Sequence, residues 1–229
     1  ILVIILGGYL LVRSAKDVFP WIVGRKRLRD FSPAGELLVL MGTLSLPLGS
    51  AGIALFQGPL GLTLANTDPA TAPSGIPIGS GLYVAFGTVL TLVIVSAAVG
   101  LRWRPKIWLL SFGVFVTIWV LLHTNFFANL GGLGSGIWQS LGYWIVQQDV
   151  ARGGQPWYYY FVLGANYEFL AVAFGAIAVW AYMVRGSAFS RFLVYWAMAN
   201  LVFFIYASEK MPWLLVGVVL PFILLSGKL

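Results

Sequence analysis

The chain has 229 residues, of which 60% are hydrophobic and 9% are charged, and its formal net charge is +7. Soluble domains carry charges on roughly a quarter of their residues, so this composition indicates an integral membrane protein. The absence of cysteine and the single histidine exclude disulfides, thiolate metal sites and a histidine cluster for zinc. The basic residues lie in short loops between apolar runs, which is typical of topology signals and not of a nucleic-acid-binding groove.

Apolar runs long enough to cross a bilayer, which takes about 20 helical residues, recur along the chain. They lie near 37–56, 81–101, 107–123, 159–184, 192–207 and 212–226, and residues 1–12 resemble part of a further run. We predict an all-α, polytopic membrane protein with about seven transmembrane helices, forming a single transmembrane domain over residues 1–229. Because the chain starts inside one apolar run and stops just after another, we interpret it as an internal fragment of a longer protein.

The loops between these runs alternate in charge. Basic residues are concentrated in 13–29, 102–106 and 185–191, whereas 57–80 has none, 124–157 has only Arg152 and 208–211 has only Lys210. The positive-inside rule places the basic loops in the cytoplasm and the other three outside. The basic run at 24–29 is either a plain topology determinant or a site for anionic lipid head groups. The Gly- and Pro-rich loop 57–80 is expected to be a flexible or loosely folded external connection.

The segment after His123 predicts a helix outside the spans. Four glycines between 131 and 136 break the preceding helix, and a new helical pattern then begins. Its apolar stripe consists of Ile137, Trp138, Leu141, Trp144 and Ile145, and its polar side of Gln139, Ser140, Gln147 and Gln148. We expect an extracytoplasmic helix near 136–149 that lies in the head-group plane or docks on other parts of the same protein.

The stretch 147–168, QQDVARGGQPWYYYFVLGANYE, is unusually polar for this chain. Asp149 and Arg152 are three residues apart and can pair. The aromatic run that includes Tyr158 is typical of residues that anchor a helix at the interface, or that stack on a sugar. Glu168 lies 12 residues past Pro156, about 18 Å along an ideal helix, and therefore well inside the predicted span unless the first turns project above the membrane. A carboxylate there indicates a ligand or relay role, or a structural partner such as His123 or Lys210.

The predicted topology gathers most ionisable groups of the outer half on one face. His123, Asp149, Arg152, Glu209 and Lys210 reach that face, and Glu168 points into it. Cationic side chains suit a phosphate and carboxylates suit sugar hydroxyls or a metal, while aromatic rings suit a sugar ring.

Two blocks of sequence add a resemblance to these patterns. YWIVQQDVARGGQPWYYYFVLGANYE and YASEKMPWLL resemble the membrane region of the flippase activity-associated protein family. That family is related to the dolichyl-phosphate-mannose protein mannosyltransferases, which are membrane glycosyltransferases of the GT-C type. The resemblance covers roughly residues 120–229, and residues 1–119 match in hydropathy alone.

The resemblance implies hexosyl transfer from a polyprenyl-phosphate sugar on the extracytoplasmic side of a prokaryotic plasma membrane, in surface glycan or glycoprotein assembly. Its catalytic acidic pair, Asp-Glu, and its His-Gly-Pro tripeptide do not occur here, so no catalytic residue is assigned. The alternatives are a lipid-linked oligosaccharide flippase component or transporter, and a non-catalytic assembly subunit.

On this hypothesis the donor phosphate and its sugar have separate binding residues. Arg152, Lys210 and His123 would meet the phosphate. Glu168, Glu209, Asp149 and Gln148 would hold hydroxyls or help to position a divalent metal, with Tyr158 beside the sugar. Membrane lipids are the other expected partners. The oligomeric state is not inferred.

Overall fold

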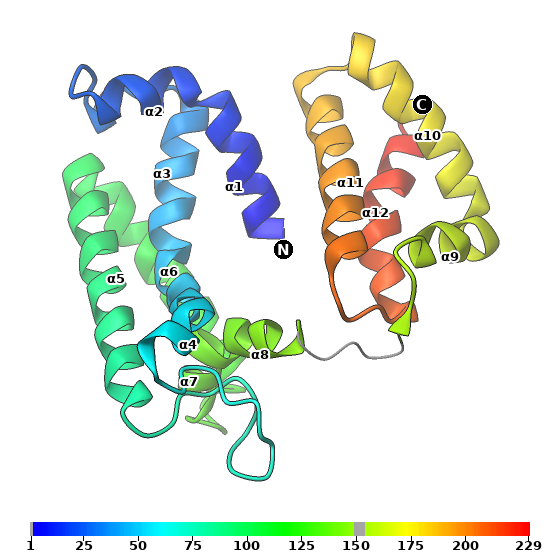
Figure 1. The fold of residues 1–229 in the computed structure, drawn as a ribbon. Helices are drawn as coiled ribbons and strands as arrows, with labels where there is room; N and C mark the ends of the chain where they lie inside the picture. The colour runs from blue at the N-terminus through cyan, green and yellow to red at the C-terminus, as the bar shows by residue number, and fades with distance from the viewer. Residues whose placement is uncertain (1, 149–153) are drawn as a thin grey trace. The chain divides into compact units, whose positions relative to one another are not determined.

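The computed structural model describes residues 2–148 and 154–229, and those residues form helices and loops without any strand (Figure 1). The chain divides into two compact units, which we describe separately. The N-terminal unit is Leu10–Gln147. The C-terminal unit combines Ile1–Tyr9 with Gln148–Leu229, as far as those residues are described.

The apolar helices confirm an all-α protein and are consistent with a multi-pass membrane protein. Among the described residues, four segments are long and apolar enough to cross a membrane, namely Pro33–Leu60, Gly81–Trp103, Pro105–His123 and Ala188–Tyr206. A fifth candidate is the pair Tyr159–Tyr167 and Phe169–Arg185, which is bent by 110°. Leu2–Arg13 and Pro212–Ser226 are apolar but shorter than the roughly 20 residues that a span needs. The expected seven spans are therefore not confirmed.

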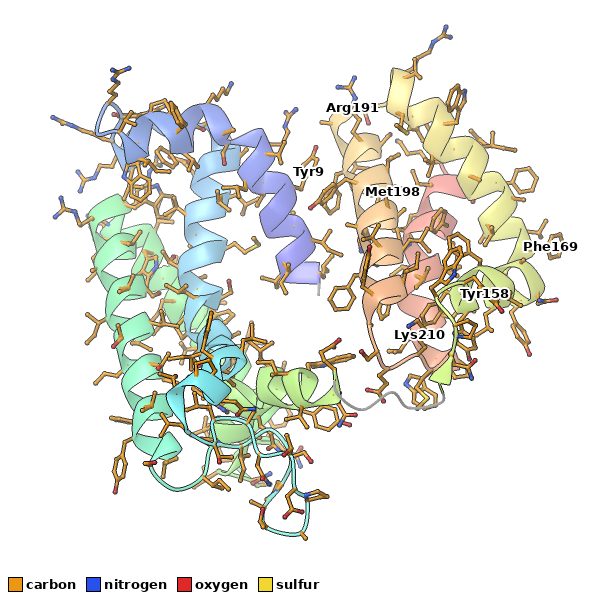
Figure 2. The ribbon with its side chains drawn as sticks, in the orientation of Figure 1. Tyr9, Tyr158, Phe169, Arg191, Met198 and Lys210 are labelled. Atoms are coloured by element: carbon orange, nitrogen blue, oxygen red, sulfur yellow. The ribbon has the colours of Figure 1, made fainter. Side chains whose placement is uncertain are left out.

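The C-terminal unit is a packed group of helices. It contains the first residues of α1 (Leu2–Arg13), then α9 (Tyr159–Tyr167), α10 (Phe169–Arg185), α11 (Ala188–Tyr206), the 3₁₀ turn η5 (Pro212–Leu214) and α12 (Leu215–Ser226). α12 packs against both α10 and α11. The Tyr9 hydroxyl donates to the Ala188 carbonyl oxygen at 3.2 Å, which ties α1 to the start of α11 (Figure 2).

The N-terminal unit is built around long apolar helices whose ends are set by proline. Its elements are α2 (Ala15–Ile22), η1 (Leu28–Asp30), α3 (Pro33–Ser45), η2 (Leu46–Phe56), α4 (Gln57–Leu60), α5 (Gly81–Trp103), α6 (Pro105–His123), α7 (Gly132–Gly134), η3 (Ser135–Gln139) and α8 (Ser140–Gln147). Pro105 occupies the first turn of α6, and Arg104 before it is extended, with φ −146° and ψ 89°. A residue before proline is disfavoured in the α region, so α5 ends there and α6 begins.

The first long span changes its helical form at Pro47. α3 is followed by an eleven-residue 3₁₀ segment, η2, with proline in its first turn. Proline has no N–H for the α-helical ladder, which accounts for the change. A side chain added at Gly42, Gly49 or Gly52 would meet no atom within 4 Å. These glycines therefore do not serve the close helix packing that glycine-rich spans commonly use.

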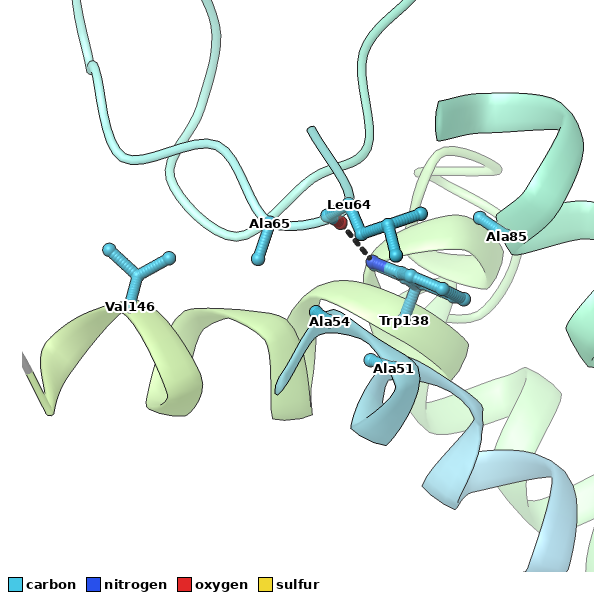
Figure 3. Close-up of a cluster of buried hydrophobic side chains, with 7 residues drawn as sticks. All are labelled: Ala51, Ala54, Leu64, Ala65, Ala85, Trp138 and Val146. Carbon is cyan, nitrogen blue, oxygen red and sulfur yellow. Dashed lines mark hydrogen bonds between the residues drawn. The ribbon is translucent and has the colours of Figure 1, made fainter. Parts of the chain in front are cut away.

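The helix that the sequence predicts near 136–149 exists and docks on its own unit. Trp138 is buried, and its indole Nε1–H donates to the Leu64 carbonyl oxygen at 3.0 Å (Figure 3). The buried cluster comprises Ala51, Ala54, Leu64, Ala65, Ala85, Trp138 and Val146, with Ile137, Leu141 and Ile145 packed against it. The apolar stripe thus faces protein, as the second of the two expectations had it.

The loop 57–80 is more ordered than its composition indicates. The Gln57 side-chain oxygen accepts hydrogen bonds from the backbone of Leu64 at 3.2 Å and Ala65 at 2.9 Å. Backbone bonds further join Asn66 to Ile76 at 2.9 Å. The loop also packs on α8, where a Cβ at Gly142 would lie 2.2 Å from the Gly75 oxygen. Only a residue without a side chain permits that approach, so specific contacts hold the backbone of this loop.

Candidate functional site

A polar cavity lies where α6 ends and η3 passes into α8. Its volume is about 420 Å³, and its wall consists of His123, Ser135, Gly136, Gln139, Ser140, Tyr143 and Trp144. No Asp, Glu, Lys or Arg is among these residues. The wall therefore offers hydroxyls, an amide, an imidazole and aromatic faces, and these groups suit an uncharged ligand with several hydroxyls.

His123 is held in place by the last turn of α6. Its Nδ1 lies 2.9 Å from the Trp119 carbonyl oxygen, and its ring stacks on the Trp119 ring with centroids 4.6 Å apart. Because a carbonyl oxygen only accepts, Nδ1 carries the proton and donates. Nε2 makes no hydrogen bond to any described residue. It is the nitrogen left to accept from a ligand hydroxyl or, when protonated, to donate to an oxyanion.

The glycines after His123 shape the cavity. A Cβ at Gly136 would lie 2.4 Å from the His123 ring and 2.8 Å from the Trp119 ring, and one at Gly132 would lie 1.7 Å from the His123 carbonyl oxygen. The glycine-rich sequence therefore brings η3 directly against the end of α6. Its role is close approach as much as the helix break that the sequence predicts.

Gln139 and Tyr143 complete the polar wall. The Gln139 amide nitrogen donates to the Ser74 carbonyl oxygen at 3.0 Å, which fixes the side chain and leaves its oxygen as an acceptor. The Tyr143 hydroxyl bonds to no other group in the described residues. In the sequence, Gln139 and Ser140 fall on the polar face of the predicted helix, but they were not assigned to the site. Their i, i+4 spacing to Tyr143 and Trp144 is the signal that groups these four side chains.

An apolar groove adjoins the polar cavity. It has a volume of about 370 Å³ and is lined by Leu44, Pro47, Leu48, Val93, Ser96, Ala97, Leu101, Trp108, Leu109, Phe112, Phe115, Val116, Trp119 and Ile137. Trp119 stacks on His123, so one aromatic pair separates the groove from the cavity. Of the described groove residues Ser96 alone has a hydroxyl, and it donates to the Thr43 carbonyl oxygen. The groove therefore offers apolar contact along α6 and ends at a polar chamber.

The C-terminal unit brings together a different set of the predicted residues. Glu209 and Lys210 lie in the turn between α11 and η5 and are mostly buried, and the Lys210 ammonium donates to the Ala207 carbonyl oxygen at 2.8 Å. The buried Tyr160 hydroxyl donates to the Met211 carbonyl oxygen at 3.3 Å and accepts from the Met211 N–H at 3.2 Å. Tyr160 thereby ties this turn to the start of α9, where Tyr158 is exposed (Figure 2). Tyr160 was not among the predicted site residues.

Glu168 is not inside a continuous span. The chain bends by 110° between α9 and α10, and Glu168 occupies the bend with φ −132° and ψ 37°. It is exposed and forms no ion pair within the described part of the chain, so Lys210 is not its partner. Beside it, the Asn166 amide donates to the Val162 carbonyl oxygen at 2.8 Å, a local bond of the kind that competes with helix continuation.

The bend changes the position of Glu168 relative to the other predicted residues. α9 has nine residues, so it separates Glu168 from Tyr158 by about 14 Å at 1.5 Å per residue. Glu168 also precedes the first turn of α10, where the helix dipole favours a negative charge. The bent pair forms either a broken span or a re-entrant loop, so the position of this carboxylate within the hydrocarbon stays a prediction.

The remaining predicted residues are Gln148, Asp149 and Arg152. Asp149 and Arg152 lie outside the described residues. Gln148 is the last residue before them and is exposed. Within the described ranges, no group of three or more His, Asp or Glu side chains is arranged to hold a metal ion.

No family model, no curated protein and no solved structure matches the chain.

Proposed function

We propose that this protein binds a polyprenyl-phosphate-linked sugar on the extracytoplasmic face of a prokaryotic plasma membrane, as the membrane core of a glycosyltransferase. The observation that supports it is the junction at Trp119 and His123, where an apolar groove along a candidate span meets a polar chamber without formal charges. An amphipathic lipid with a sugar head likewise has one apolar end and one end rich in hydroxyls.

Two parts of this ligand, the polyprenyl chain and the sugar, have matching surfaces in the described residues. The polyprenyl chain lies against Phe112, Phe115 and Trp119, where it makes van der Waals contacts with aromatic rings. The sugar enters the chamber, where Trp144 and Tyr143 offer ring faces and Gln139 offers an amide oxygen. A site that pairs with hydroxyls discriminates against an analogue without the hydroxyl, because protein groups are then left unpaired.

The groove also bears on the transporter alternative. Moving a sugar head across the membrane needs polar groups along the path, since unpaired polar groups in an apolar environment cost several kcal/mol. The described groove lining provides few polar groups: the Ser96 hydroxyl and the Trp108 indole N–H are already bonded, and the Trp119 indole N–H is a single buried donor. This favours holding a lipid-linked sugar at one end of α6 over carrying it through the unit.

Lipid binding in nanodiscs tests the proposal. His123→Phe and Tyr143→Phe keep the rings and remove polar atoms, and each is expected to weaken binding of a polyprenyl-phosphate hexose up to about tenfold, the value of one neutral hydrogen bond. Binding of sugar-free polyprenyl phosphate is expected to be unchanged. The control is Tyr83→Phe, which removes a hydroxyl from a residue of α5 that is 80% exposed.

Two results would count against this assignment. Equal affinity of the wild-type protein for the sugar-linked and the sugar-free lipid would show that the polar cavity at His123 does not bind the sugar. Sugar-lipid binding with full affinity in both chamber variants would place the sugar elsewhere. If binding holds, incubation of the protein with the donor lipid and a candidate acceptor measures transfer, and intact binding without transfer would indicate the assembly role.

A further inference from the structure

A second cavity lies at the other end of the N-terminal unit and is strongly basic. Its volume is about 440 Å³, and its wall includes Trp21, Lys26, Arg27, Arg29 and Arg102, together with Gly24 and Leu28. Four of the seven lining residues are cationic and none is acidic. It is separated from the polar chamber by α6, whose 19 residues correspond to about 28 Å.

The loop that carries these cations is held by a buried carboxylate. Asp17 is 1% exposed, and its Oδ1 accepts from the Lys26 ammonium at 2.6 Å. Its Oδ2 accepts from the Ser32 N–H at 3.1 Å and from the Ser32 hydroxyl. These bonds close the loop between α2 and α3 and neutralise Lys26. These bonds do not involve the three arginines of the wall, whose positive charges stay available to a bound anion.

Arg29 is positioned so that part of its guanidinium is free. Its Nε donates to the Trp103 carbonyl oxygen at 2.9 Å and more weakly to that of Arg102 at 3.3 Å. The two terminal nitrogens form no hydrogen bond within the described residues. A guanidinium anchored in this way presents two parallel N–H groups, the geometry that binds a phosphate through both oxygens.

Apolar side chains are exposed beside the basic wall. On and after α2, Phe19 is 70% exposed, Ile22 is 68% exposed and Val23 is 48% exposed. Trp21 belongs to the cavity wall and is 41% exposed. A short helix with aromatic and aliphatic residues next to clustered arginines has the composition of a segment that lies on an anionic membrane surface.

We propose that this basic cavity binds the phosphate of an anionic glycerophospholipid. Arg27, Arg29 and Arg102 hold the phosphate oxygens, while Phe19 and Ile22 lie at the level of the glycerol and upper acyl chains, with Trp21 between the two. This site is independent of the sugar-lipid chamber, since the two share no lining residue. The chemistry also admits a soluble phosphate compound, which the test separates from the lipid.

The experiment uses the whole chain in a zwitterionic detergent and a short-chain phosphatidylglycerol as the probe. Arg27→Gln with Arg102→Gln removes two wall cations whose side chains form no hydrogen bond or ion pair within the described residues. A cation near an anionic surface contributes about a fivefold affinity, so the double variant is expected to bind about 30-fold more weakly. Arg185→Gln with Arg191→Gln is the matched control, because it removes the same charge outside this cavity.

Three comparisons decide the result. Short-chain phosphatidylcholine is expected to bind weakly and equally to wild type and both variants. Glycerol 3-phosphate and inorganic phosphate are expected to compete poorly, because they lack acyl chains. Competition by either at the affinity of the lipid would overturn the lipid assignment in favour of a soluble phosphate, and equal losses in the two double variants would overturn the site. Thermal unfolding of each variant checks that the fold is retained.

Discussion

The two ends of the N-terminal unit are organised by different interactions. At the end where α6 begins, a buried Asp17 binds Lys26 and Ser32, Arg104 pairs with Glu36, and further arginines line a cavity. At the end where α6 stops, the wall around His123 contains no Asp, Glu, Lys or Arg, and backbone contacts at glycine set its shape.

This difference shows what each end can recognise. Charge acts over a distance and selects for an anion, which fits a phosphate at the basic end. Neutral hydrogen bonds act only at short range and with defined directions, so the chamber at His123 depends on shape and suits a hydroxyl-rich group. Substitutions should therefore affect the two ends in different ways, through packing at one and through pH and salt at the other.

The largest effect is expected at the end that depends on shape. Gly142→Ala places a Cβ 2.2 Å from the Gly75 carbonyl oxygen, a backbone atom that cannot rotate away. We expect the free energy of unfolding to fall by about 2 to 3 kcal/mol and the melting temperature by about 5 to 10 °C. Gly134→Ala is the control, because its Cβ would meet no atom within 4 Å. Equal melting temperatures in the two variants would show that the close contact at Gly142 does not determine the stability of this end.

A smaller effect that depends on pH is expected at the basic end. The hydrogen bond from the Lys26 ammonium, followed by that from the Ser32 hydroxyl, lowers the pKa of Asp17 from its ordinary value of 3.8. A lowered pKa stabilises the fold above the unfolded value, and this contribution is lost as the pH falls from 3.8 through the lower folded pKa. Asp17→Asn is expected to cost about 2 kcal/mol at neutral pH, and the difference from wild type should shrink in acid.

Thermal unfolding across an acid titration measures this difference. Asp30→Asn serves as the control, since Asp30 is exposed and its carboxylate makes no hydrogen bond to the described residues. A gap between wild type and Asp17→Asn that stays constant as the pH falls below 3.8 would mean that the carboxylate is not held as an ion.

The smallest effect concerns the ion pair between Glu36 and Arg104. The two side chains are 26% and 43% exposed, and pairs near the surface contribute roughly 0.2 to 1 kcal/mol. A double-mutant cycle with Glu36→Gln and Arg104→Gln measures the coupling energy, which should fall further as salt is added. A coupling energy well above 1 kcal/mol, or one that does not respond to salt, would show that this pair is shielded from solvent.

Much of the fold was predictable because the signals for it are local. Pro33 and Pro105 mark helix starts through the backbone geometry of proline, and both helices begin there. The Ser187 hydroxyl accepts from the Ser190 N–H at 3.3 Å at the start of α11, as serine before a helix predicts.

The errors come from features that hydropathy does not encode. Residues 159–184 read as one apolar run, yet α9 and α10 separate at Glu168. The stripe that contains Trp138 would have looked the same facing lipid or protein, and only the partner surface from η2 and the loop after it distinguishes the two. A pattern within one helix carries no information on what lies opposite.

The candidate site was predictable in part. His123 was chosen because it ends a span on the expected outer face, and it does line a polar cavity. Gln139 and Tyr143 were not chosen, since their contribution depends on the approach of η3 to α6. Asp149 and Arg152 stay predictions.

The bend at Glu168 also limits the length of helix α10 in the C-terminal unit. With the chain interrupted there, α10 has 17 residues and Pro212–Ser226 has 15, so they cover about 25 Å and 22 Å along their axes. A hydrocarbon core is about 30 Å thick, and each ångström of mismatch costs a fraction of a kcal/mol. Pro33–Leu60, at 28 residues, has no such shortage. If α10 and Pro212–Ser226 cross a bilayer, a thick bilayer is expected to strain them before it strains Pro33–Leu60.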